Sequence, residues 1–304
     1  MIVRNPLTQP LSFLGLEVVV LVCAALTFAH ALGRLRRSGD RLPLFTWIAI
    51  LSYGVVMELV SYNTVDNFTH GPFTVMLYHG KLPLYVVAVY PVLLYTGITL
   101  ARRLGLARWA EPLVAGLAIV LLDVPFDVLG PDQGWWSWSP TDVNIAARWE
   151  GVPLTSYYWH IAFGACLALL TRSCERWLKL GWTMGLAPLV GAMTIVAGGL
   201  SFIPFHLLQN EGVSDGANLA ILVTVCLGAL LFGRRGAPVE RPDRILLTTA
   251  LAYHALFLLV LLTRSSVEDG AQKAAILLVG TACSVGLHLY GQIRGIRQPL
   301  AARA

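Results

Sequence analysis

The sequence predicts an all-α integral membrane protein, a single domain over residues 1–304 built as a bundle of about nine transmembrane helices. Composition is the first observation behind this prediction. Hydrophobic residues make up 56% of the chain and charged residues only 13%, which is typical of polytopic membrane proteins. The second observation is a series of apolar stretches of about 20 residues, the length that an α-helix needs to cross a bilayer. The third is the distribution of Lys and Arg among the loops.

The predicted spans follow one another along the whole chain. The first apolar stretch is too long for the core of a cleavable signal peptide, and it ends in Arg34, Arg36 and Arg37, so we interpret it as a span. Several later stretches are short or interrupted by Pro, which leaves eight or ten spans as alternatives. The nine expected spans are residues 12–33, 42–62, 82–100, 111–130, 154–171, 182–208, 217–233, 245–263 and 273–292.

Basic residues alternate between successive loops and thereby predict an orientation. Of the 22 Lys and Arg residues, 17 fall in loops on one side of the predicted membrane and five on the other. Because cytoplasmic loops carry an excess of basic residues, the amino end is expected outside and the carboxyl end in the cytoplasm of a multi-pass cell-membrane protein. The net charge of +5 therefore reflects topology. The basic segments are 34–41, 101–110, 172–181, 234–244 and the tail after 292.

Several functional classes are excluded by what the sequence lacks. No basic face with stacking aromatics is present, so no nucleic-acid partner is expected. The five cysteines include no CxxC pair, and four lie in predicted spans, which argues against a disulfide framework or a thiolate metal site. HExxH, GxSxG, Walker and GxGxxG motifs and clustered histidine boxes are all absent. We therefore expect no metal and no cofactor; a Zn or Fe site joining His70 and His79 to His160 or His206 is the weaker alternative.

Three carboxylates lie inside predicted spans, where a charge is costly. Glu58 lies in the outer third of the second span and must be protonated, paired or hydrated. Asp123 and Asp127 share one face of the fourth span, with a helix-kinking Pro125 between them. Alternatively, Asp123 simply accepts hydrogen bonds from a neighbouring span and Asp127 lies at the membrane interface. Their similar depth predicts a polar pocket on the outer side of the membrane, with Glu58, Asp123 and Asp127 as its catalytic residues.

Further polar and aromatic residues are predicted to gather around the same pocket. His70, His79, His160 and His206 could each either line the pocket or pack between helices. Three tryptophans within residues 135–138 fit either an interfacial belt or the mouth of a pocket, where aromatic faces stabilise cations. The predicted substrate-binding residues are Asn63, Asp66, His70, His79, Trp135, Trp136, Trp138, Glu150, Tyr158, His160 and His206.

Two blocks of the sequence resemble the integral-membrane carotenoid biosynthesis proteins, the group that contains the carotenoid hydratases of the bacterioruberin pathway. The first block is MELVSYNTVDNFTHGPFTVMLYHGKLPLYVVAVYPVLLY, residues 57–95. The second is LLDVPFDVLGPDQGWWSWSP at 121–140 with WEGVPLTSYYWH at 149–160. The resemblance covers residues 50–165. It departs from the family at DVPFD, where the family has an Asp-Pro element, and at SYYWH, where the family has Asn and Gly-Trp.

This resemblance, together with the intramembrane carboxylates, favours an enzyme acting on an isoprenoid or carotenoid-type lipid by acid-initiated hydration or cyclisation of a C=C bond. Small polytopic terpene cyclases are similar in their chemistry. Protonating an isolated C=C bond requires a carboxylic acid in a dry site and a second group that accepts a proton or positions water. The expected partners are a hydrophobic isoprenoid or other lipid substrate and the membrane lipids. A non-enzymatic lipid-binding or transport protein and a His/Asp metal-dependent lipid hydrolase are the alternatives.

Overall fold

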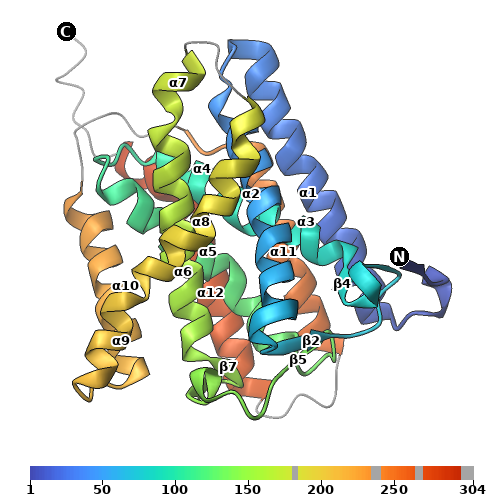
Figure 1. Ribbon diagram of the computed structural model, residues 1–304. Coiled ribbons are helices and arrows are strands. Elements are labelled where there is room, and N and C mark those ends of the chain that lie inside the picture. Colours follow the sequence, from blue (N-terminus) through green and yellow to red (C-terminus); the bar gives the residue numbers. More distant parts are fainter. Residues whose placement is uncertain (180–183, 234–240, 264–269, 296–304) are drawn as a thin grey trace, which may run out of the picture.

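The computed structural model describes residues 1–179, 184–233, 241–263 and 270–295 (Figure 1). Helices dominate it, and short strands join the loops at one end. The helices are α1 (Leu11–Ser38), α2 (Leu42–Val60), α3 (Leu84–Tyr90), α4 (Thr96–Arg103), α5 (Ala110–Leu129), α6 (Leu154–Ser173), α7 (Glu175–Lys179), α8 (Ala187–Ser201), α9 (Ile203–Asn210), α10 (Asp215–Phe232), α11 (Arg244–Thr263) and α12 (Gly270–Gly295). The strands are β1 (Ile2–Val3), β2 (Phe68–His70), β3 (Val75–Leu77), β4 (Leu82–Pro83), β5 (Trp136–Trp138), β6 (Arg148–Trp149) and β7 (Val152–Pro153).

The all-α prediction is confirmed, and each of the nine predicted spans coincides with helical structure. Eight helical segments are long and apolar enough to cross a membrane. The ninth predicted span is α6, which has 20 residues and therefore a length of about 30 Å, enough for a crossing. Its first turns carry Ser156 and His160, so it is less apolar than the other eight. The chain is thus a multi-pass membrane protein, and its predicted orientation stays a prediction.

Two spans contain irregular turns that a simple hydropathy pattern does not indicate. The third span runs from Leu84 to Arg103 and contains a π-helical turn at Pro91–Tyr95. Proline has no amide hydrogen, so the regular i to i−4 ladder is broken there and a wider turn accommodates the gap. The second span ends in a π-helical turn at Ser61–Val65.

The core of the bundle lies around α5 and the third span, each of which is 83% buried over its apolar window. α5 packs against α4, α6, α10 and α12. Gly116 permits the closest of these approaches, because a Cβ atom there would lie 2.3 Å from the carbonyl oxygen of Ile161 in α6. Small residues at such crossings let membrane helices pack backbone to backbone. This close packing holds α5 and α6 in a fixed register.

The outer helices present apolar side chains to the surroundings of the bundle. Only 22% of the apolar window of Met184–Asn210, and 17% of that of α10, is buried within the protein. Large side chains such as Leu200 and Leu207 are 60% exposed. In water such a surface would be unfavourable, whereas in a bilayer it is the expected lipid-facing surface.

The segment between α2 and α3 and the segment between α5 and α6 pair with each other at one end of the bundle, which we call the strand end (Figure 1). β2 and β5 form an antiparallel pair in which Phe68 faces Trp138 and His70 faces Trp136. The amide of Gly71 extends the pairing by donating to the carbonyl of Trp135 at 2.8 Å. The loops thus fold back over the ends of the helices and lay aromatic and histidine side chains against the core.

Candidate functional site

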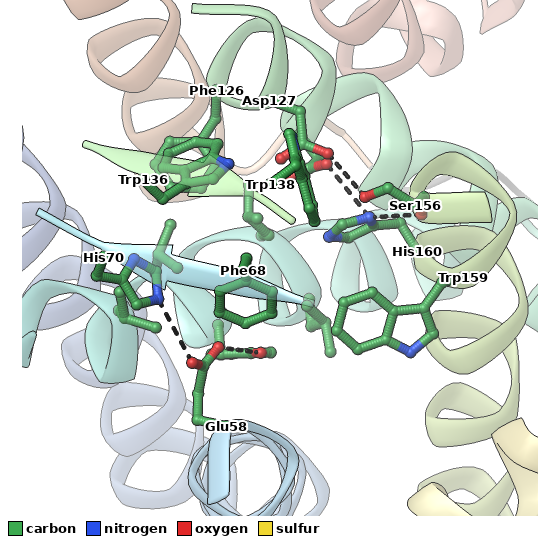
Figure 2. A pocket seen from close by; sticks show the side chains of 16 residues that line it. Glu58, Phe68, His70, Phe126, Asp127, Trp136, Trp138, Ser156, Trp159 and His160 are labelled. Carbon is green, nitrogen blue, oxygen red and sulfur yellow. Dashed lines mark hydrogen bonds and ion pairs between the residues drawn. The ribbon is translucent and has the colours of Figure 1, made fainter. Parts of the chain in front are cut away.

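A cavity of about 80 Å³ lies between the helices and the β2–β5 pair. Its walls come from α2, α5, α6, the third span and both strands. Figure 2 shows two groups of polar side chains across it, with the ring of Phe68 between them in this view. The residues that line it are Glu58, Phe68, His70, Val86, Val89, Tyr90, Leu93, Leu94, Asp123, Phe126, Asp127, Trp136, Trp138, Ser156, Trp159 and His160.

The first polar group is centred on Glu58, which is 4% exposed. Tyr62 donates a hydrogen bond of 2.6 Å to Oε2, and Tyr90 donates one of 2.8 Å to Oε1. Nε2 of His70 lies 3.5 Å from Oε2. Both carboxylate oxygens therefore accept hydrogen bonds from phenols, and these bonds fix the orientation of the carboxylate.

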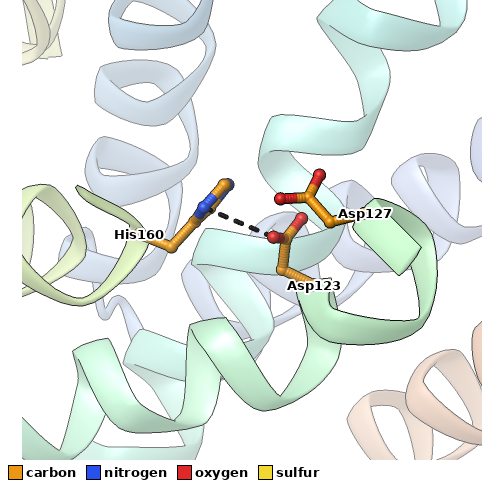
Figure 3. Close-up of side chains that lie close together, drawn as sticks. All are labelled: Asp123, Asp127 and His160. Atoms are coloured by element: carbon orange, nitrogen blue, oxygen red, sulfur yellow. Dashed lines mark ion pairs between the residues drawn. The ribbon is translucent and has the colours of Figure 1, made fainter. Parts of the chain in front are cut away.

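The second polar group joins Asp123 and Asp127 of α5 to His160 and Ser156 of α6. The hydroxyl of Ser156 donates to Asp127 Oδ2 at 2.8 Å. His160 Nδ1 donates to the backbone carbonyl of Ser156 at 2.9 Å and lies 3.3 Å from Asp123 Oδ2. Each pair is spaced i, i+4, so two helix faces meet here side by side. Figure 3 shows both carboxylates and the imidazole pointing toward one another.

Asp123 is the most deeply buried carboxyl of this group, at 1% exposed. Its neighbours are the imidazole of His160 at 3.3 Å and the carboxyl of Asp127, and no amide or hydroxyl of the described residues donates to it. A carboxyl buried with so few donors is energetically costly, and at functional sites such costs are commonly retained for chemistry. Asp123 is therefore a candidate to meet a bound group.

Aromatic rings fill most of the remaining wall. Phe126 and Trp136 pack with their ring centroids 4.4 Å apart, and Phe68 meets Trp138 edge to face at 5.9 Å. Trp159 completes the wall on the α6 side. Such rings exclude water, and their faces stabilise positive charge. The cavity thus combines carboxyl groups with a dry aromatic lining.

A wider groove of about 430 Å³ adjoins the cavity. It runs between α2, α6 and the α8–α9 segment and shares Phe68, Trp138, Ser156 and Trp159 with the inner cavity. These four side chains therefore form a common wall between the inner cavity and a larger space at the side of the bundle.

One cluster of possible metal ligands occurs in the described part of the chain. Asp123, Asp127 and His160 each offer a ligand atom, and these atoms lie within 4.8 Å of one another. Two N or O ligands of a tetrahedral Zn²⁺ lie about 3.4 Å apart, so the three side chains would have to draw together before they could hold one ion. His160 Nδ1 donates to a carbonyl, which leaves Nε2 as the nitrogen with a lone pair, the usual arrangement of a metal-bound imidazole.

The structure brings together seven of the residues that the sequence predicted for the pocket, and an eighth lines the wider groove. The seven that line the inner cavity are Glu58, Asp123, Asp127, His70, Trp136, Trp138 and His160. His206 lines the groove, where its ring bonds Gln209 at 3.0 Å.

Six predicted residues line neither space, and the structure gives them other contacts. Trp135 is fully buried against Phe126 and Phe257, so neither the belt nor the pocket-mouth prediction describes it. Tyr158 packs on Phe202 and Phe205. The other four are Asn63, bonded by Tyr78, Glu150, bonded by Gln272, and the loop residues Asp66 and His79, which adopt positive φ.

Four residues with a polar side-chain atom line the cavity or contact Glu58 and were not predicted: Tyr62, Tyr90, Ser156 and Trp159. Two of them carry a sequence signal, since Tyr62 lies four residues after Glu58 and Ser156 four before His160, the spacing of helix neighbours. Tyr90 is 32 residues from Glu58, and only the packing of the third span against α2 brings it there.

Comparison with known proteins gives one match. Residues 3–208 match the family described as "Domain of unknown function (DUF7802)". No curated protein and no solved structure matches the chain. The matched region includes every residue of the inner cavity.

Proposed function

The chain belongs to the DUF7802 family, whose description names no function, and we propose that it is a membrane-embedded enzyme acting on a lipid. The substrate is an isoprenoid or carotenoid-type lipid, and the reaction is acid-initiated hydration or cyclisation of a C=C bond. The observation that supports this most is the pairing of two buried carboxylates, Asp123 and Asp127, at an aromatic cavity inside a membrane protein.

The proton donor in this reaction is the Asp123–Asp127 pair. Two carboxylates this close in a dry site share one proton, because two adjacent negative charges are strongly unfavourable there. The proton passes from the pair to one carbon of the C=C bond, whose electron pair forms the new C–H bond. A tertiary carbocation and a second carboxylate result. Asp123, which accepts no hydrogen bond from an amide or hydroxyl in the described structure, faces the substrate.

The carbocation then follows one of two courses. In hydration, water attacks the cation, a C–O bond forms, and the excess proton returns to the aspartate pair directly or through His160. In cyclisation, a second C=C bond supplies the electron pair for a C–C bond, and the resulting cation loses a proton to Glu58 or His70. Proton exchange with water then deprotonates that residue and returns one proton to the aspartate pair. Glu58, which accepts two phenol hydrogen bonds, serves as the carboxylate of the site. Neither course needs an oxidant, and both regenerate the enzyme.

The aromatic lining supports the same chemistry. Trp136, Trp138 and Phe126 face the cavity, and ring faces stabilise a cation by about 0.5–2 kcal/mol each at desolvated sites. The resemblance to the carotenoid biosynthesis proteins rests on blocks that contain Glu58, Asp123, Trp136 and Trp138, all of which line this cavity.

A metal-dependent lipid hydrolase is the second candidate, and the Asp123, Asp127 and His160 ligand set favours it. A divalent cation held by these three side chains would polarise an ester and activate water. Metal analysis of the purified protein separates the two candidates. Stoichiometric metal that is lost in Asp123→Asn supports the hydrolase, and metal-free protein that turns over its substrate supports acid chemistry.

Mass spectrometry of lipid extracts tests the main proposal. The extracts come from cells that produce the wild-type protein and from cells that produce the Asp123→Asn variant. A lipid that gains the mass of one water indicates hydration, and a new isomer of unchanged mass indicates cyclisation. Identical lipid profiles in the two cell lines, with both proteins present in the membrane, contradict the proposal.

A further inference from the structure

We propose that the substrate is a neutral amphipathic lipid without a phosphate group, which enters the site sideways from the membrane through the groove beside α8 and α9. This inference rests on the proposed function, because it takes the inner cavity as the reaction site. It adds the route of entry and the class of headgroup.

The groove and the cavity lie next to each other. Phe68, Trp138, Ser156 and Trp159 line both, so only side chains separate a lipid chain in the groove from the inner cavity, and rotation of these side chains joins the two spaces. The volumes are about 430 Å³ and 80 Å³. The groove can thus hold an extended chain, whereas the inner cavity has room for only a short segment of it. One C=C bond at a time reaches the carboxylates.

The mouth of the groove is formed where the predicted sixth span is divided into α8 and α9. α9 begins at Ile203, with Pro204 in its first turn. Two adjacent glycines precede the break and differ in their surroundings. A Cβ atom on Gly198 would lie 2.3 Å from the ring of Phe163 in α6, whereas a Cβ atom on Gly199 would meet no atom within 4 Å. Gly198 holds α8 against α6, and Gly199 leaves the groove open beside it.

The far side of the same helices is exposed and apolar. Leu200, Ile203 and Leu207 are 60%, 51% and 60% exposed. In a bilayer these side chains contact lipid, so the groove behind them opens next to the hydrocarbon. A substrate that is insoluble in water can therefore pass from the bilayer into the groove without exposure to the aqueous phase.

Charge determines which headgroups the path accepts. Among the described residues that line the two spaces, four are carboxylates (Glu58, Asp123, Asp127 and Asp142) and none is Lys or Arg. At the loop side the groove ends in Asp142, Asn144 and Gln209. These groups can bond a hydroxyl or a similar neutral head, whereas a phosphate would meet four carboxylates and no Lys or Arg, with only the imidazoles of His70, His160 and His206 to balance its charge. The proposed path thus disfavours prenyl diphosphates and favours free prenyl alcohols.

A matched pair of photoreactive probes tests both parts of the inference: geranylgeraniol carrying a diazirine, and its diphosphate. The purified full chain in detergent is labelled with each probe, and the labelled peptides are identified by mass spectrometry. We expect the alcohol to label peptides that line the groove and the diphosphate to label them at least about tenfold less, a difference of about 1.4 kcal/mol.

Gly199→Leu fills the groove and has room for its side chain, so we expect it to lower labelling by the alcohol about tenfold. Gly228→Leu in α10 is the control, because a Cβ atom there also meets nothing within 4 Å and the residue lines neither space. Undiminished labelling of Gly199→Leu overturns the route of entry, and equal labelling by the diphosphate overturns the neutral headgroup.

Binding and turnover are read separately in this experiment. Asp123→Asn is expected to be labelled like the wild type while losing turnover. If the alcohol labels the groove of a protein that alters no lipid, the proposed reaction is contradicted and the proposed route of entry is supported. If the protein turns over a lipid but its groove is not labelled, the route of entry is contradicted and the reaction is supported.

Discussion

The phenol of Tyr90 in α3 donates a hydrogen bond of 2.8 Å to Oε1 of Glu58 in α2, across 32 residues of sequence. Both residues are buried, and this bond joins the second and third spans at the wall of the cavity. Glu58 therefore has a structural as well as a chemical role, and variants that separate the two roles are informative.

Tyr90→Phe removes this donor and leaves the ring in place. We expect the free energy of unfolding to fall by about 1 kcal/mol, the scale of hydrogen bonds between membrane helices. Turnover should also fall, because Glu58 loses one of the two phenols that orient it. Denaturation in mixed micelles and the lipid assay measure the two effects. A Tyr90→Phe protein that loses stability but keeps its full rate would show that the orientation of Glu58 is irrelevant to the reaction.

Gly130→Ala tests the position of Trp136. A Cβ atom at residue 130 would lie 1.9 Å from the indole ring of Trp136, so the ring must move out of its place in the cavity wall. Overpacking of this kind costs about 1–3 kcal/mol. The matched control is Gly228→Ala, where the added methyl group meets nothing within 4 Å and stability should stay within about 1 kcal/mol of the wild type. Equal stability of the two variants would contradict the packing described for Trp136.

At the end of the bundle opposite the strand end, the ion pairs of Asp243 predict how the stability of the protein depends on pH. Asp243 precedes α11 and lies 3.1 Å from His30 Nε2 and 3.7 Å from Arg103 Nη1. Burial alone raises the pKa of Asp243, but the hydrogen bond and charge of His30, the amide of Leu246 and the charge of Arg103 outweigh it and hold this pKa well below its usual range.

A carboxyl whose pKa is lowered by folding stabilises the native state above its unfolded pKa of about 3.9 and loses that contribution as pH falls toward the folded value. Acidification from about pH 5 to about pH 3 should therefore destabilise the wild type more than Asp243→Asn. Thermal denaturation in detergent across this window measures the difference. The same pH dependence in both proteins would mean that Asp243 is not held by these partners.

Much of the fold could be predicted from hydropathy, since all nine predicted spans coincide with helices. α6 shows why the pattern is incomplete: its polar residues, Ser156 and His160, face α5 and lower its apparent hydropathy, although the helix is buried against its neighbours. The π-helical turn at Pro91–Tyr95 depends on how the third span packs, and a window average cannot detect it.

The site could be predicted in part, because intramembrane carboxylates are rare and stand out. Glu58, Asp123 and Asp127 were predicted to share one pocket on that basis, and the structure places them around one cavity. The contributions of His70 and Trp136 depend on the pairing of β2 with β5, a long-range register that residue types alone do not fix. Trp135 illustrates the same limit, since the pairing turns it into the core while its neighbour faces the cavity.

The most direct test of the central claim compares turnover by the double variant Asp123→Asn, Asp127→Asn with that of Glu17→Gln. Glu17 is an apt control, being a buried carboxylate of α1 that accepts bonds from Thr74 and lines neither space. Asparagine keeps the shape of aspartate but cannot deliver a proton, so turnover per folded molecule should fall about 100- to 10,000-fold, while Glu17→Gln stays near the wild-type rate. A double variant that folds and reacts at the wild-type rate would contradict acid catalysis by the aspartate pair.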